Sequence, residues 1–282
     1  MSLETARIID AQVHIWAADT PQRPWPARHA PHRAQPLSAD ELIARMDEAG
    51  VDAAILVPPS WEGERNDLVL AACERYPDRF AAMGRIDPAD PKLVETIAAW
   101  RSHPGAAGLR FALHRPGMAE ALVDGSLDAV WEAAQAHQVP VALLVPQARI
   151  QHVDEMARRY PRLSITLDHL GVPSSVPMTE RFSNLDRLLA LAKHDNIAVK
   201  ASALPSLAPD AYPYRSMHTH LRKVVEAFGA RRVFWGTDMS RLPCTYRESV
   251  EMFTVHMPWL AEDDKEWIMG RAIREWLGLR TP

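Results

Sequence analysis

The order of strands and helices along the chain constrains the fold more than any other feature. Short apolar runs rich in β-branched residues alternate with longer segments whose apolar residues recur at helical spacing. Eight such pairs follow one another with mostly short connections, which is the pattern of a closed (β/α)8, or TIM, barrel. We predict one α/β domain of this kind over residues 1–282. Its predicted strands cover residues 8–16, 51–57, 80–86, 106–111, 139–145, 163–167, 197–200 and 232–235.

The predicted helices follow these strands in turn. The first begins at Ser38, which forms a capping box with Glu41, and it ends at Gly50. An open doubly wound sheet would show the same alternation, but no GxGxxG motif follows the first strand, so the closed barrel is favoured. The other predicted helices cover residues 68–76, 91–100, 127–137, 150–160, 180–194, 215–228, 247–255 and 264–277.

A long loop separates the first strand from the first helix. Residues 19–36 contain five prolines and can form neither a helix nor a central strand. Ordered loops of about this length tend to be lids or binding loops. The loop also carries His29 and His32, which we expect to be solvated.

Composition limits the class of partner and the compartment. The 282 residues include 32 basic and 36 acidic side chains, so the net charge of −4 offers no cationic surface for nucleic acid. A small molecule is the expected partner. No signal peptide or membrane-spanning run is recognised, and Cys73 and Cys244 stand far apart without metal-ligand spacing. These features predict a cytoplasmic protein.

Polar residues gather where the predicted strands end. In a (β/α)8 barrel the carboxyl ends of the strands form the rim that carries the active site. Two histidines, an aspartate and an amide at three strand ends therefore predict a functional site. The rim residues, in chain order, are Gln12 and His14, Arg110, His169, Lys200 and Asp238.

Several short motifs make the chain resemble a known family. In this order and spacing they are similar to the amidohydrolase-related branch of the amidohydrolase superfamily, nearest its sugar-lactonase and 2-pyrone-4,6-dicarboxylate lactonase group. The resemblance implies a (β/α)8 hydrolase that opens cyclic esters, with Asp238 as the general base, and a homodimer would be unsurprising. The motifs are Asp10-Ala11-Gln12-Val13-His14, Gly63-Glu64-Arg65-Asn66, Tyr76-Pro77-Asp78-Arg79-Phe80, Gly108-Leu109-Arg110-Phe111, Leu167-Asp168-His169-Leu170-Gly171 and Trp235-Gly236-Thr237-Asp238.

One residue departs from the family pattern and bears on the metal. The family's strand-one motif is usually His-x-His, and Gln12 stands at the first histidine position. A glutamine amide oxygen is a poor zinc ligand. Two expectations remain open: no metal, or one divalent ion such as zinc or manganese held by His14, His169 and Asp238.

The metal-free alternative can be written as a mechanism. Asp238 would take a proton from the attacking water, while His14, His169 and the Gln12 amide would donate hydrogen bonds to the developing oxyanion. Substrate carboxylate or hydroxyl groups would be held by side chains at the ends of strands two and four. The candidates are Arg110, His114, Arg115, Ser60 and Trp61, while Lys200 is expected to be structural.

Three functions remain open at this point. The first is hydrolysis of a lactone, or similar cyclic ester, of a small acidic or hydroxylated substrate. The second is a metal-dependent decarboxylation or C–N hydrolysis on the same scaffold. The third is a catalytically silent barrel that binds a ligand, which the Gln12 substitution makes conceivable.

Overall fold

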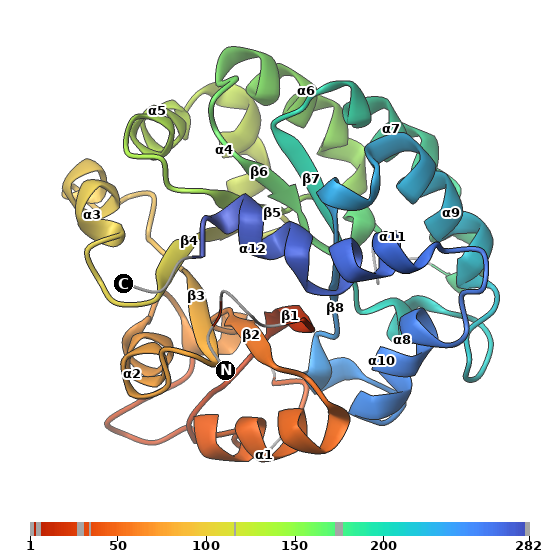
Figure 1. Cartoon of the computed structure of the whole chain (residues 1–282). Coiled ribbons are helices and arrows are strands. Elements are labelled where there is room, and N and C mark those ends of the chain that lie inside the picture. Colours follow the sequence, from red (N-terminus) through yellow and green to blue (C-terminus); the bar gives the residue numbers. More distant parts are fainter. Residues whose placement is uncertain are drawn as a thin grey trace.

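Eight parallel strands form the centre of the computed structural model, which describes residues 3, 7–26, 31–33, 35–115, 117–172 and 177–279 (Figure 1). Each strand pairs in parallel with the next along the chain, in the order β1 to β8. The predicted (β/α)8 barrel is therefore confirmed. The strands are β1 (Ile9–Val13), β2 (Ala53–Leu56), β3 (Phe80–Gly84), β4 (Ala106–Ala112), β5 (Val141–Leu144), β6 (Ile165–Leu167), β7 (Ile197–Ser202) and β8 (Val233–Gly236).

The seam between β8 and β1 is held largely by one buried carboxylate. Asp10 accepts hydrogen bonds from the backbone nitrogens of Gln12 (3.0 Å) and Thr237 (2.9 Å), and from the hydroxyls of Thr237 (2.5 Å) and Tyr246 (2.8 Å). Further along the same two chain segments, the backbone nitrogen of Asp238 donates to the carbonyl oxygen of Gln12 at 2.8 Å. The seam thus places Asp238 beside the first strand.

Helices surround the barrel, and their positions agree closely with the periodicity of the sequence (Figure 1). Apolar faces of these helices pack on the strands, which are buried along almost their whole length. The helices that match predicted ones are α1 (Ala39–Ala49), α2 (Asp67–Arg75), α3 (Leu93–Trp100), α5 (Asp128–Ala136), α6 (Ile150–Arg159), α9 (Met217–Phe228) and α10 (Tyr246–Thr254).

Two predicted helices differ from the structure. Residues 180–194 are not one helix, because only α7 (Leu185–Leu189) is α-helical and it continues into a 3-10 helix over Ala190–Lys193. The last predicted helix is divided by a π-helical turn at Trp267–Arg271 into α11 (Glu262–Glu266) and α12 (Ala272–Leu277). Glycine is required within this turn, since a Cβ on Gly270 would lie 2.2 Å from the carbonyl oxygen of Arg7. The sequence also did not predict α4 (Met118–Asp124) or α8 (Leu204–Leu207).

The predicted capping box at the start of α1 is present. The Ser38 hydroxyl accepts from the Glu41 backbone nitrogen at 3.2 Å, and the Glu41 carboxylate accepts from the Ser38 backbone nitrogen at 2.9 Å. The predicted stop is also confirmed, because Gly50 ends the helix at a φ of 75°.

Loss of this cap should lower stability measurably. We expect Ser38→Ala to reduce the free energy of unfolding by about 1 kcal/mol, because one helix N–H loses its acceptor. The midpoint of urea unfolding measures the change. An unchanged midpoint would show that water satisfies this group equally well.

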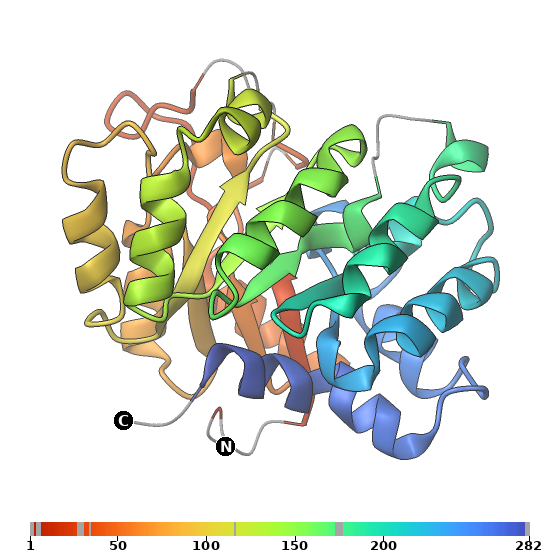
Figure 2. The same cartoon turned by 90° about the horizontal axis from the view of Figure 1, so that it is seen from above.

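The two ends of the barrel differ in what covers them. Seen from the side, α12 lies at the end from which the strands start, whereas the β4 arrow points to the opposite end (Figure 2). Two described residues of the long loop contact the chain just after β8: His32 contacts Ser240 Oγ, and Arg33 donates to the carbonyl oxygens of Met239 and Ser240. The base of the loop is joined by a bridge between Trp16 and Leu37. Among the described residues, no helix is long and apolar enough to cross a membrane.

Candidate active site

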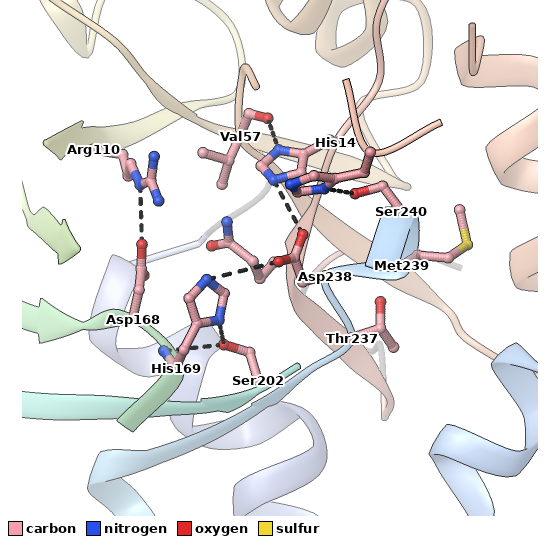
Figure 3. Close-up of polar contacts among 12 residues, drawn as sticks. His14, Val57, Arg110, Asp168, His169, Ser202, Thr237, Asp238, Met239 and Ser240 are labelled. Atoms are coloured by element: carbon pink, nitrogen blue, oxygen red, sulfur yellow. Dashed lines mark hydrogen bonds and ion pairs between the residues drawn. The ribbon is translucent and has the colours of Figure 1, made fainter. Parts of the chain in front are cut away.

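A buried aspartate lies at the centre of the polar rim. Asp238 directly follows Thr237 at the end of β8, is 2% exposed, and has a left-handed φ of 49°. Its Oδ1 lies 3.2 Å from His14 Nε2 and its Oδ2 lies 3.8 Å from His169 Nε2 (Figure 3). Burial disfavours the charged carboxylate, yet the hydrogen bond and charge of His14 and the charge of His169 hold the pKa of Asp238 well below its usual range. The carboxylate is therefore ionised at neutral pH.

His14 is oriented by the second strand. Its Nδ1 lies 2.6 Å from the carbonyl oxygen of Val57, which can only accept, so Nδ1 carries a proton and Nε2 faces Asp238. The ring of Trp61 packs edge-on at 5.9 Å between centroids. These contacts hold the imidazole in one orientation toward the carboxylate.

His169 is held by a strained turn and by the neighbouring strand. It follows β6 with a φ of 54°, a conformation that non-glycine residues rarely adopt. Ser202 at the end of β7 accepts from the His169 backbone nitrogen at 3.3 Å and contacts its Nδ1 at 2.8 Å. Strained backbone of this kind gathers at functional sites, and here it turns the imidazole toward Asp238 (Figure 3).

A second buried network lies beside this group. Asp168 pairs with Arg110 Nε at 3.0 Å and with Lys200 Nζ at 3.0 Å. Lys200 Nζ also donates to Gln12 Oε1 at 2.7 Å. These four side chains are at most 5% exposed. The rim therefore contains two cations, one anion and an amide that are almost completely shielded from solvent.

Burial and charge act against each other in this network. Burial would raise the pKa of Asp168, but the positive charges of Lys200 and Arg110 hold it well below its usual range. Burial lowers the pKa of Lys200, and the attraction of Asp168 opposes that change. The two groups therefore stabilise each other's charged forms.

Of the predicted substrate-binding residues, Arg110 belongs to the buried network that includes Asp168. Its Nε is engaged by Asp168, and its terminal nitrogens point away from that carboxylate (Figure 3). Arg115 is tied to Glu64 Oε1 at 2.7 Å and to the carbonyl oxygen of Ser60 at 3.3 Å. His114 is exposed in the turn after β4.

Trp61 and the loop residue His32 both lie beside the His14 ring. Trp61 is 2% exposed and packs against Trp16 at 5.4 Å, so its ring is part of the wall that supports His14. His32, which we expected to be solvated, is exposed, and it also contacts Ser240 Oγ at 2.8 Å and lies 4.9 Å from the Trp61 ring, measured between centroids. His29 lies outside the described residues.

Three contributors to the site were not predicted as functional from the sequence. Asp168 adjoins the predicted His169 in the same motif, and its buried carboxylate was the available signal. Lys200 and Ser202 are two apart on β7 and therefore point to one side of the strand, which the period of two could have indicated. Their partners, Gln12 and His169, come from distant parts of the chain.

The residues present do not fit the metal site that a His-x-His strand would build. Among the described residues, no group of three or more histidine, cysteine, aspartate or glutamate side chains is placed to hold a metal ion. The ligating atom that Gln12 offers, Oε1, already accepts a hydrogen bond from the Lys200 ammonium. We therefore derive no catalytic step through a metal.

The fold and the site define a class of protein: a (β/α)8 barrel with an aspartate after β8 and histidines after β1 and β6 on its rim. Residues 9–279 match the amidohydrolase family, so the chain belongs to that family. The end-to-end resemblance inferred from the motifs is thereby confirmed.

Individual relatives and solved structures are similar to the chain over most of their length. It is 26% identical over 236 residues to an L-fucono-1,5-lactonase of Burkholderia ambifaria, covering 83% of this chain and 81% of the relative. An amidohydrolase of Burkholderia multivorans solved with bound zinc superposes with a TM-score of 0.81 at 20% identity, covering 97% of this chain and 99% of that one. A probable 2-pyrone-4,6-dicarboxylic acid hydrolase of Acinetobacter baumannii, solved with citric acid, gives a TM-score of 0.76 at 18% identity, covering 97% and 100%.

Proposed function

We propose that this protein hydrolyses a lactone, or a similar cyclic ester, of a small hydroxylated or acidic molecule. One observation carries the proposal: a buried, ionised carboxylate, Asp238, lies on the barrel rim with its oxygens 3.2 Å from His14 Nε2 and 3.8 Å from His169 Nε2. Similarity to an L-fucono-1,5-lactonase over most of both chains supports a cyclic ester as substrate.

The proposed reaction begins with a water molecule next to Asp238. The carboxylate takes a proton from that water as its oxygen attacks the lactone carbonyl carbon. Negative charge then develops on the carbonyl oxygen, where the Gln12 amide nitrogen and the His169 imidazole supply hydrogen-bond donors, while His14 stays engaged with Val57 and Asp238. When the ring C–O bond breaks, the leaving oxygen takes the proton, and the product is an open hydroxy acid that ionises at neutral pH.

Arg110 is the candidate for holding the rest of the substrate. Asp168 fixes the guanidinium through Nε, and no described residue bonds its terminal nitrogens. A guanidinium held in this way can bind a carboxylate with two parallel hydrogen bonds, or donate a hydrogen bond to a hydroxyl oxygen. We also propose a cytoplasmic location, which the two free cysteines support, and a small molecule as the only partner that the reaction needs.

Proton release provides a direct test. The purified protein is offered a panel of five- and six-membered sugar lactones and carboxylated lactones in weak buffer with a pH indicator. We expect turnover of at least one lactone, with acid released in a one-to-one ratio to lactone consumed. If no lactone on the panel is opened while the protein is folded and binds a panel member, the silent ligand-binding barrel becomes the better explanation.

A further inference from the structure

We propose that Lys200 is a positioning residue that fixes the Gln12 carboxamide with its oxygen toward the ammonium and its nitrogen toward substrate, so that this site works without a divalent cation at β1. The proposal rests on the proposed lactone hydrolysis for its kinetic consequences. Its consequence for metal binding does not depend on which reaction the site performs.

The orientation of the amide follows from the chemistry of its partner. Lys200 Nζ lies 2.7 Å from the Gln12 side chain, and an ammonium group can only donate. The atom that faces it must therefore be Oε1, and Nε2 must point the other way. Asp168 Oδ1, 3.0 Å from the same ammonium, keeps Lys200 in place.

The nitrogen of the Gln12 amide is a hydrogen-bond donor that is available to a substrate atom. Gln12 is fully buried, and its Nε2 has no hydrogen-bond partner among the described residues. Buried donors are nearly always paired, so one without a partner at the centre of a site calls for an explanation. An oxyanion or carbonyl oxygen of the substrate would supply the missing acceptor.

The same contact works against a metal ion. A cation bound at β1 would have to take the one ligating oxygen of Gln12 from an ammonium already 2.7 Å away. The two positive charges would repel each other in a buried environment, where charge interactions are poorly screened. In addition, Asp168 pairs with Arg110 as well as with Lys200. Its negative charge is therefore already balanced by two cations and would attract a metal ion only weakly.

Zinc binding tests the proposal without reference to activity. Wild type, Gln12→His, Lys200→Met and the double variant Gln12→His/Lys200→Met are stripped with chelator, dialysed against zinc and analysed for metal content. We expect about one zinc per chain only in the double variant, with an affinity at least about tenfold above wild type. Stoichiometric zinc in wild type, held as tightly as in the double variant, would overturn the proposal.

Kinetics tests the positioning role separately. We expect Gln12→Met to lower kcat by about 10²- to 10³-fold with little change in KM, as for loss of an oxyanion donor. Lys200→Met should also lower kcat, and Lys200→Met/Gln12→Met should lose no more than Gln12→Met, because Lys200 acts through the amide. Additive losses would mean that Lys200 acts elsewhere and would contradict the proposal.

Two controls keep the outcomes separate. Asp168 retains Arg110 as a partner when Lys200 is replaced, so Lys200→Met is expected to fold, and Lys200→Gln replaces it if circular dichroism shows otherwise. Wild-type turnover should persist after prolonged chelation. If no lactone is opened at all, the proposed function fails, and the zinc experiment still decides the present inference.

Discussion

Replacing Asp238 by asparagine should reduce lactone hydrolysis by about 10²- to 10⁴-fold in kcat/KM, the usual contribution of a positioned general base. Asparagine has nearly the same shape but cannot take a proton from water. Asp238 is the carboxylate that faces both His14 Nε2 and His169 Nε2, at 3.2 and 3.8 Å, so no neighbouring group of the described site can substitute for it. Initial rates of acid release, measured with the best lactone of the panel, give the value.

A matched variant separates loss of the base from general damage. Asp263→Asn makes the same change on a side chain that is 75% exposed, and it should leave kcat/KM unchanged. Both variants should show the circular dichroism spectrum of wild type. Full turnover by a folded Asp238→Asn would exclude this aspartate as the base and would direct attention to the imidazoles.

The largest effect on stability is expected at Asp168. Asp168→Asn removes the negative charge that pairs with Arg110 at 3.0 Å and Lys200 at 3.0 Å, leaving two buried cations without a counter-charge. Breaking a buried ion pair from one side typically costs about 3 to 5 kcal/mol. We expect a fall of that size in the free energy of unfolding, measured by urea denaturation.

An exposed pair provides the comparison. Asp47 lies 2.7 Å from Arg79, but its side chain is 61% exposed, and exposed pairs contribute at most about 1 kcal/mol. Asp47→Asn should therefore shift the unfolding midpoint only slightly. Equal shifts for the two variants would mean that water or rearrangement compensates the buried cations, and that the network is not a main source of stability.

The periodicity of the sequence predicted most of the fold, for a local reason. Buried parallel strands and amphipathic helices each leave a pattern within a few residues of chain, and all eight strands lie where that pattern occurs. The predictions failed within two helices. The predicted helix at 180–194 is interrupted, and the one at 264–277 is divided by a π-helical turn whose Gly270 packs against the Arg7 carbonyl oxygen from the start of the chain.

Local sequence patterns predicted only part of the candidate site. Positions at strand ends singled out His14, His169 and Asp238, and the structure brings these three together. Their orientation depends on partners that no local pattern indicates, such as the Val57 carbonyl for His14 and Ser202 for His169. His32 is likewise brought to the site by the path of the long loop.

Gln12 shows most clearly what each level of structure determines. The sequence alone showed an amide at residue 12, where the resemblance to the family implied a histidine, and predicted that a barrel would place it on the rim. Only the tertiary structure decided what that amide does, because Lys200 lies 188 residues away and reaches it from β7. Side-chain identity is a property of the chain, whereas the partner of a buried polar group is set by which strands the closed barrel brings face to face.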